Sequence, residues 1–287
     1  MKEKSNWLDR LAALVGQGGI GAGVLIGSRA RAERPADEYS DLDVILLVDD
    51  IEPFLHTDGW LAGLGEVGLS FVEDTVAGGK ERRILFADGQ DVDFLFLRAD
   101  ALAALAHDRG FREVAATHRV LFDKVGVDAV LPAMESGVAP AAAPSAEEFT
   151  NAVHNFWFHT VWAMKKVRRG EWWVAKQCVD GYLKGLLLTM LEWHAHALHG
   201  LGYRTWHSGR FLEQWAEPWV VEALPSTFGA YGAEGICAAL EGTMALYHRA
   251  AAECAGCLGY AYPAGAEDFA RACLQGLAGE HRASGAE

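Results

Sequence analysis

A proline- and alanine-rich segment, "LPAMESGVAPAAAPSAEE" (residues 131–148), constrains the fold of this 287-residue chain more than any other feature. It holds three of the eight prolines, and it separates two halves with different hydrophobic patterns. Short apolar runs lie close together before it, whereas stretches with apolar residues at helical spacing follow it. The segment therefore predicts two domains, one over residues 1–135 and the other over residues 136–287.

The first half contains four apolar runs that are typical of short β-strands: "GVLIG", "DVILLV", "RILFA" and "VDFLFL". Asp88-Gly89 lies between the last two runs and is a hairpin turn signal. Helices are predicted before and after the strands, at Ser5–Gly16 with Ser5 as N-cap and at Ala99–Asp108. Because the strands are too close for every connection to be a crossover helix, we expect a mixed sheet flanked by helices.

The second half is predicted to be a helical bundle, which makes the fold class α+β. Ser145 and Glu148 form a capping-box pattern that begins a long helix, and Gly170 interrupts this helix. A second long helix is expected from Glu171 to His199. Three histidines near its end have no carboxylate or cysteine at metal-ligand spacing and are interpreted as surface residues: His194, His196 and His199.

The formal net charge of −14 is concentrated in the first half of the chain. Residues 1–150 carry 26 acidic and 14 basic side chains, whereas residues 151–287 carry 13 and 11. Nucleic-acid binding normally requires a basic face, so we expect no nucleic-acid partner. An acidic surface attracts metal ions or a polycationic small molecule, although solubility alone explains the charge equally well.

The chain has none of the sequence features of a membrane or secreted protein. No apolar run approaches the roughly 20 residues of a membrane span, and the N-terminus lacks the apolar core of a signal peptide. Five cysteines, an odd number, fit a reducing compartment. We therefore expect a cytoplasmic protein with no membrane partner, and we expect it to be a monomer.

Two acidic residues lie close together at the start of the second predicted strand. Asp41 and Asp43 are two residues apart, so on a strand their side chains point to the same face. Two ionised carboxylates at this spacing repel each other unless a cation lies nearby, although solvated aspartates beside a turn are the simpler explanation. A third carboxylate, Asp93, lies on the strand "VDFLFL", with Asp91 as its rival on the same face. Three carboxylates on neighbouring strands favour a site for Mg²⁺.

A Gly-Ser pair ends the first predicted strand. Gly27 allows the backbone to approach a phosphate closely, and the hydroxyl and amide of Ser28 are suited to hold phosphate oxygens. The two residues and the carboxylates together predict a site for a metal-bound phosphate compound.

The pattern G-S-x12-D-x-D, followed by one aspartate on a later strand, resembles the nucleotidyltransferase superfamily of the DNA polymerase β type. Longer segments narrow this resemblance: "LIGSRA", "DEYSDLDVILLVDDIEPF", "VDFLFLRADAL", "EEFTNAVHNFWF" and "LGYAYP". They are similar to the aminoglycoside 6-adenylyltransferases that inactivate streptomycin, and the similarity extends over nearly the whole chain.

The resemblance implies a Mg²⁺-dependent enzyme with ATP as co-substrate. Such an enzyme transfers AMP to a hydroxyl of a streptomycin-like aminoglycoside, releases pyrophosphate and thereby inactivates the antibiotic. The resemblance also implies that residues 1–135 form the catalytic nucleotidyltransferase domain and that residues 136–287 bind substrate or nucleotide. Another aminoglycoside, a lincosamide or a protein as acceptor remains the alternative, and a non-catalytic nucleotide sensor belongs to a different class of function.

Roles for individual residues follow from the same resemblance. Asp41 and Asp43 match the paired metal-binding aspartates, and Asp93 matches the third, which is also the expected general base. The expected nucleotide-binding residues are Gly27, Ser28, Arg29, Lys165 and Lys176. For the two lysines a purely structural role stays open, because basic side chains near a helix C-terminus are favoured by the helix dipole.

Overall fold

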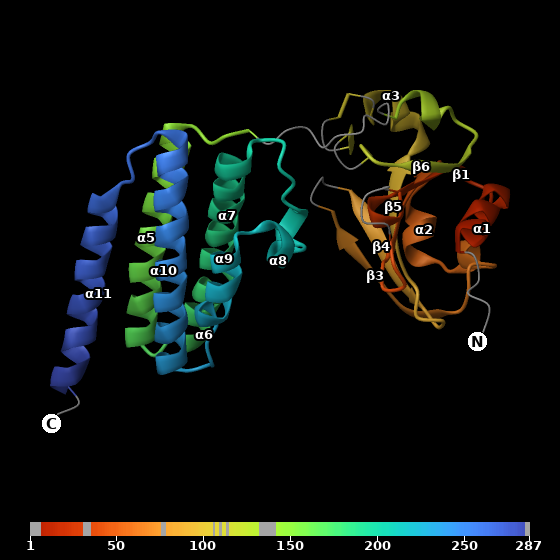
Figure 1. Ribbon diagram of the computed structural model, residues 1–287. Helices are drawn as coiled ribbons and strands as arrows, with labels where there is room; N and C mark the ends of the chain where they lie inside the picture. Colours follow the sequence, from red (N-terminus) through yellow and green to blue (C-terminus); the bar gives the residue numbers. More distant parts are fainter. Residues whose placement is uncertain are drawn as a thin grey trace. The chain divides into compact units, whose positions relative to one another are not determined.

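The computed structural model divides the chain into two compact units, Met1–Val138 and Ala139–Glu287. The first unit contains a mixed β-sheet and the second is helical (Figure 1), which confirms the predicted fold class. The predicted N-cap Ser5 and most of the proline- and alanine-rich segment lie outside the described residues. The structure describes residues 7–30, 36–75, 79–105, 107–108, 111–112, 115–131 and 142–284.

The sheet of the first unit has six strands in the order β3-β4-β5-β2-β1-β6. Strands β2 and β5 pair in parallel, and every other neighbouring pair is antiparallel. The predicted hairpin at Asp88-Gly89 is confirmed, since β4 and β5 pair across it and Gly89 has a φ of 89°. The strands are β1 (Ile20–Ile26), β2 (Leu42–Val48), β3 (Val67–Asp74), β4 (Lys80–Phe86), β5 (Asp91–Arg98) and β6 (Arg119–Asp123).

The two faces of the sheet are packed differently because side chains alternate along each strand. Val44 and Leu46 of β2 enter the core under α1 (Trp7–Ala12) and α2 (Glu52–His56). Their neighbours Ile45 and Leu47 point to the opposite face and share a core with residues near α3 (Leu102–Leu105). Asp43 has the same parity as Ile45 and therefore lies on this second face.

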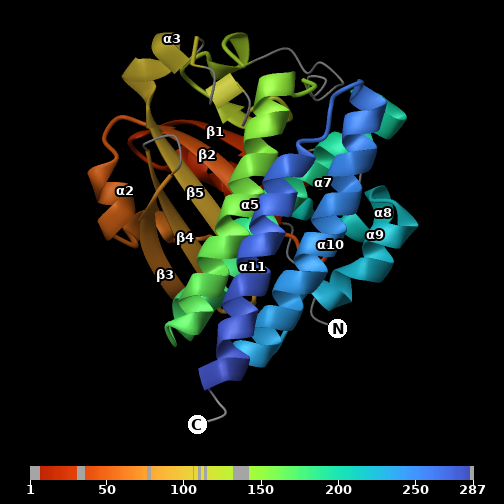
Figure 2. The same cartoon turned by 90° about the vertical axis from the view of Figure 1, so that its left-hand side faces the viewer.

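The helical unit is built on long helices that run side by side (Figure 2). The capping box is confirmed, since Ser145 Oγ accepts from the Glu148 amide at 3.1 Å and Glu148 Oε2 accepts from the Ser145 amide at 2.8 Å. Within the described residues, no helix combines the length and the apolarity that crossing a membrane requires. The helices are α5 (Ala146–Arg168), α6 (Trp172–Gln177), α7 (Leu183–His199), α8 (Leu212–Trp215), α9 (Pro218–Ala223), α10 (Ala233–Leu258) and α11 (Ala264–Ser284).

The second long helix is interrupted, although the sequence predicts a continuous one. It was expected without a break from Glu171 to His199, but a π-helical turn at Cys178–Tyr182 separates α6 from α7. It ends as expected, with Gly200 at a φ of 92°. An extra residue in one turn has no signature in apolar periodicity, which explains why the spacing alone predicted one regular helix.

Hydrogen bonds connect the "FW" of α5 with the "YAYP" segment before α11. The indole Nε1 of Trp157 donates to the hydroxyl of Tyr262 at 3.0 Å, and this hydroxyl donates to Glu267 Oε2 at 2.6 Å. Tyr260 donates to the carbonyl oxygen of Pro144 at 2.8 Å. These bonds fasten the turn between α10 and α11 to α5, so the two segments have a structural role within the helical unit.

Replacing Tyr262 by phenylalanine is expected to lower the free energy of unfolding by about 1–3 kcal/mol, because buried polar groups of Trp157 and Glu267 lose a partner. Urea unfolding followed by circular dichroism measures this change. Tyr231→Phe is the matched control, since Tyr231 is 61% exposed and its ring contact with Trp172 survives the substitution. Equal stability of the two variants would contradict the expectation.

The interpretation of the three histidines as surface residues is wrong for His194. The residue is 1% exposed, and its Nε2 lies 2.9 Å from Glu253 Oε2 on α10. His199 is exposed and lies 2.7 Å from Glu217, while His196 lies 3.0 Å from the carbonyl oxygen of Tyr203. The partner of His194 is 59 residues away in sequence, so local ligand spacing did not reveal it.

Candidate active site

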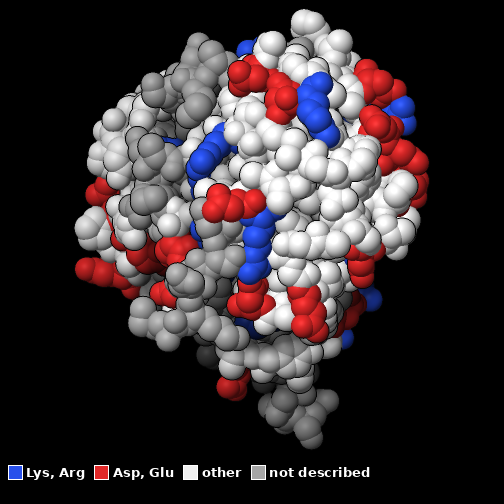
Figure 3. Space-filling model, turned by 90° about the vertical axis from the view of Figure 1, so that its right-hand side faces the viewer, with Lys and Arg blue, Asp and Glu red and all other residues white. Residues whose placement is uncertain are grey.

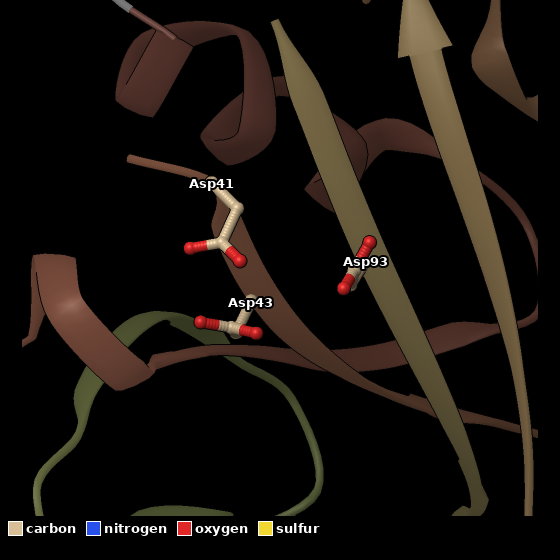
Figure 4. A group of neighbouring side chains, drawn as sticks. All are labelled: Asp41, Asp43 and Asp93. Carbon is tan, nitrogen blue, oxygen red and sulfur yellow. The ribbon is translucent and has the colours of Figure 1, made fainter. Parts of the chain in front are cut away.

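The structure brings the three predicted aspartates together on one face of the sheet. One carboxylate oxygen from each of Asp41, Asp43 and Asp93 lies within 4.8 Å of the other two (Figure 4). All three side chains are partly buried. Among the described residues, Asp93 and not its rival Asp91 belongs to this group, and Asp91 is exposed.

Strand pairing explains this meeting of residues that are far apart in sequence. In the parallel register of β2 and β5, Asp43 is directly opposite Asp93. Their neighbours Leu42 and Val92 are fully buried in the core on the other face, so each strand is fixed in orientation. Asp41 precedes β2 by one residue and reaches the same side.

Gly27 fits tightly against this group. It follows β1, and its φ of +69° is in the left-handed region that favours glycine. A Cβ at this position would lie 2.1 Å from Asp43 Oδ2 and 3.0 Å from Asp43 Cγ. The absence of a side chain at Gly27 therefore leaves the space that the Asp43 carboxylate occupies.

Ser28, the residue that follows Gly27, has a hydroxyl group whose surroundings are unusual. Its Oγ is buried and has no hydrogen-bond partner among the described residues. A buried hydroxyl without a partner costs free energy, and such cases in native structures call for an explanation such as an absent ligand. A phosphate oxygen is an acceptor that would satisfy it.

Arg29 is engaged with the backbone of the loop that leads to β2. Its guanidinium donates to the carbonyl oxygens of Ser40 at 2.9 Å, Asp41 at 3.2 Å and Asp37 at 3.4 Å. A fourth contact is with Gln90 Oε1 at 3.4 Å. The side chain therefore fixes the loop that carries Asp41, and its expected contact with the nucleotide stays a prediction.

The surroundings of Asp93 change the pKa of its carboxyl group. Burial raises its pKa from 3.8 to about 6, and the negative charges of Glu81, Asp41 and Asp91 act in the same direction. The guanidinium of Arg83 acts in the opposite direction. A carboxylate with a pKa of about 6 is ionised at neutral pH yet more basic than an ordinary aspartate, which suits a general base.

This raised pKa predicts a pH-dependent effect on the stability of the metal-free protein. Because the folded state holds the proton more tightly than the unfolded state, the ionised Asp93 is a cost to folding above about pH 6, and this cost disappears as the pH falls toward 4. Asp93→Asn should therefore raise the unfolding temperature more at about pH 7.5 than at about pH 5. Thermal melts in EDTA measure both shifts, and equal shifts at the two pH values would refute the expectation.

The two predicted phosphate-binding lysines lie in the helical unit and differ in their surroundings. Lys165 is exposed in the last turn of α5. Lys176 pairs with Asp180 at 2.6 Å and donates to the carbonyl oxygen of Gly229 at 2.5 Å. The part of either lysine in phosphate binding stays a prediction.

Sequence reasoning missed two basic residues with specific contacts. Lys184 on α7 donates to the carbonyl oxygens of Val179 and Thr227 and to Thr243 Oγ1, and burial lowers its pKa to about 8. Arg83 on β4 is directly opposite Asp93. The Asp88-Gly89 signal did not reveal Arg83, because a two-residue turn would place Ile84 opposite Asp93, whereas the observed loop has the Phe86 amide donating to the Gln90 carbonyl at 2.8 Å.

Basic side chains on the face of the molecule in Figure 3 are dispersed. Those that are described lie apart from one another, each next to acidic or uncharged side chains. A nucleic-acid backbone is usually followed by a continuous row of positive charge. The described side chains of this face do not form such a row.

Known proteins are similar to this chain over most of its length. A family model described as streptomycin adenylyltransferase matches residues 1–276. The aminoglycoside 6-adenylyltransferase of Bacillus subtilis strain 168 is 25% identical over 247 residues, which are 83% of this chain and 85% of that protein. The aminoglycoside 6-adenylyltransferase of Campylobacter jejuni is 25% identical over 245 residues, 83% of each chain. The crystal structure of an aminoglycoside 6-adenyltransferase from Bacillus subtilis has a TM-score of 0.45 and 19% identity, covering 94% of this chain and 96% of that one.

Proposed function

The chain belongs to the streptomycin adenylyltransferase family, and we propose that it transfers AMP from ATP to a hydroxyl of a streptomycin-like aminoglycoside. The observation that carries this proposal is the group of Asp41, Asp43 and Asp93 within 4.8 Å of one another. Two relatives that are 25% identical over 83% of the chain are aminoglycoside 6-adenylyltransferases, which supports an aminoglycoside as the acceptor.

The donor set fits a hard divalent cation. Three carboxylate oxygens close to one another are the ligands that Mg²⁺ prefers, and we assign this site to Asp41, Asp43 and Asp93. When bound, Mg²⁺ would neutralise charge on the phosphates and orient them for an in-line displacement. The buried hydroxyl of Ser28, which lacks a described partner, supports a phosphate oxygen next to this group.

In the proposed reaction the acceptor hydroxyl oxygen bonds to the α-phosphorus of ATP. The bond from that phosphorus to the oxygen shared with the β-phosphate breaks, and pyrophosphate leaves. We assign removal of the hydroxyl proton to the carboxylate of Asp93, which accepts the proton as the new bond to phosphorus forms. Gly27 and Ser28 hold phosphate oxygens through the backbone and the hydroxyl.

We assign the chemistry to residues 1–135 and a part in binding nucleotide and acceptor to residues 136–287, with Lys165 and Lys176 as candidate phosphate-binding residues. The acidic first half, with 26 acidic and 14 basic side chains in residues 1–150, supports a polycationic acceptor. We also propose that the protein is a cytoplasmic monomer.

Incubation of the purified chain with Mg²⁺, ATP labelled on the α-phosphate and streptomycin tests the proposal. We expect pyrophosphate release and a streptomycin product that carries the label. Turnover with another aminoglycoside or a lincosamide, but not with streptomycin, would keep the chemistry and replace the acceptor. Label on a protein would favour protein adenylylation, and ATP binding without turnover on any acceptor would overturn the enzymatic function.

A further inference from the structure

Two consecutive arginines on β4 point to opposite faces of the sheet. Arg82 is 6% exposed and donates to Ser70 Oγ and to the carbonyl oxygens of Phe54 and Thr57 on the α2 face. Arg83 lies on the other face and is 44% exposed. The first arginine is therefore part of the packing, whereas the second extends over the face that carries the three aspartates.

Arg83 is surrounded by carboxylates from three strands. Its Nε lies 2.7 Å from Glu81 Oε1, 2.8 Å from Glu73 Oε1 and 3.5 Å from Asp93 Oδ2. Among the described residues, it is the basic side chain that lies within ion-pair distance of Asp93. Three carboxylates thus share the Nε of Arg83, and that of Asp93 is the most distant of them.

Strand register makes this contact a fixed feature of the sheet. Arg83 is opposite Asp93 in the antiparallel pair of β4 and β5, and Asp93 is opposite Asp43 in the parallel pair of β5 and β2. The three residues form one row across neighbouring strands, with side chains on the same face. The guanidinium therefore approaches the aspartate group from the β4 side.

We propose that Arg83 is a positioning residue that fixes the Asp93 carboxylate and lowers the affinity of the aspartate group for a free divalent cation. This inference rests on the proposed metal-binding role of the three aspartates. A positive charge beside the group offsets repulsion among the carboxylates when no metal is bound, and it opposes the approach of a second cation. The site then favours a metal ion that arrives with the negatively charged nucleotide.

Titration of the metal-free protein with Mn²⁺, followed by electron paramagnetic resonance of the free ion, tests the charge effect. Arg83→Met should tighten Mn²⁺ binding about three- to tenfold, since one nearby positive charge is removed. Arg83→Lys keeps the charge and should bind Mn²⁺ as the unchanged protein does. Lys80→Met is the matched control, because Lys80 is on the same strand but pairs with Asp74 and has the parity of Arg82; its Mn²⁺ affinity should not change.

Steady-state kinetics of AMP transfer test the positioning. Arg83→Met should lower kcat about tenfold with the KM for ATP changed less than twofold, and Arg83→Lys should recover part of kcat. A purely structural role predicts no tightening of Mn²⁺ binding. Unchanged or weaker Mn²⁺ binding by Arg83→Met, or the same change in Lys80→Met, would overturn the inference.

The folding of each variant is measured as well. Circular dichroism melts check that each variant is folded, and Arg83→Gln replaces the methionine variant if the latter unfolds. If the unchanged protein transfers AMP to no acceptor, the proposed function fails, but the Mn²⁺ titrations still decide whether Arg83 sets the affinity of the group.

Discussion

Replacing Asp41 or Asp43 by asparagine is expected to lower the rate of AMP transfer by about two to three orders of magnitude while the chain stays folded. Either substitution removes a negative charge from a group whose oxygens lie within 4.8 Å of one another, and the amide is a much weaker ligand for Mg²⁺. Loss of one of two repelling carboxylates should leave the unfolding temperature of the metal-free protein unchanged or raise it.

Pyrophosphate release measures the rate of AMP transfer, and thermal melts of the same preparations measure the unfolding temperature. Asp91→Asn is the matched control, because Asp91 is a nearby exposed aspartate on β5 that is outside the group. It should keep transfer within about twofold of the unchanged protein, since its carboxylate holds no metal in the proposed site. Near-normal activity of Asp41→Asn or Asp43→Asn would remove the metal-site interpretation.

Replacing Gly27 by alanine is expected to lower the rate of transfer about a hundredfold, through the position of Asp43. The new methyl group would lie 2.1 Å from Asp43 Oδ2, so the Asp43 carboxylate must leave its present position in the aspartate group. The left-handed φ of +69° adds a cost of about 1–2 kcal/mol to the folded state. The effect on activity should therefore exceed what the loss of stability explains.

Gly63→Ala separates these two contributions. Gly63 also has a positive φ, of +98°, but an added Cβ meets no atom within 4 Å. This variant should show a comparable loss of stability in urea unfolding and normal transfer kinetics. If Gly27→Ala transfers AMP as fast as Gly63→Ala, close contact with Asp43 has no role in the reaction.

Much of the fold could be predicted because its signals are local. The Asp88-Gly89 turn and the alternation of the flanking runs identified the hairpin of β4 and β5. The spacing of Ser145 and Glu148 identified the capping box of α5. The period of two along a strand also placed Asp41 and Asp43 on one side, and the family match over residues 1–276 confirms the resemblance seen in the quoted segments.

What could not be predicted depends on partners that are distant in sequence. The engagement of Arg29 with three backbone carbonyls requires the folded loop before β2. The burial of His194 depends on Glu253 of another helix, and the place of Arg83 beside Asp93 depends on the pairing register. Pattern reasoning assigns a side chain to a face of an element, but it does not determine which distant group occupies the space above that face.

The parallel pair of β2 and β5 also has a consequence for the order of folding. The hairpins of β3 with β4 and of β4 with β5 join nearby residues, whereas Asp43 and Asp93 are 50 positions apart in sequence and meet only when the chain between them has closed into a loop. Closing this loop costs more chain entropy than closing either hairpin, so a partly folded chain contains hairpins without the aspartate group. Under the proposed metal role, a divalent cation would bind only the completed sheet, and its concentration would shift the folding equilibrium toward the native state by mass action.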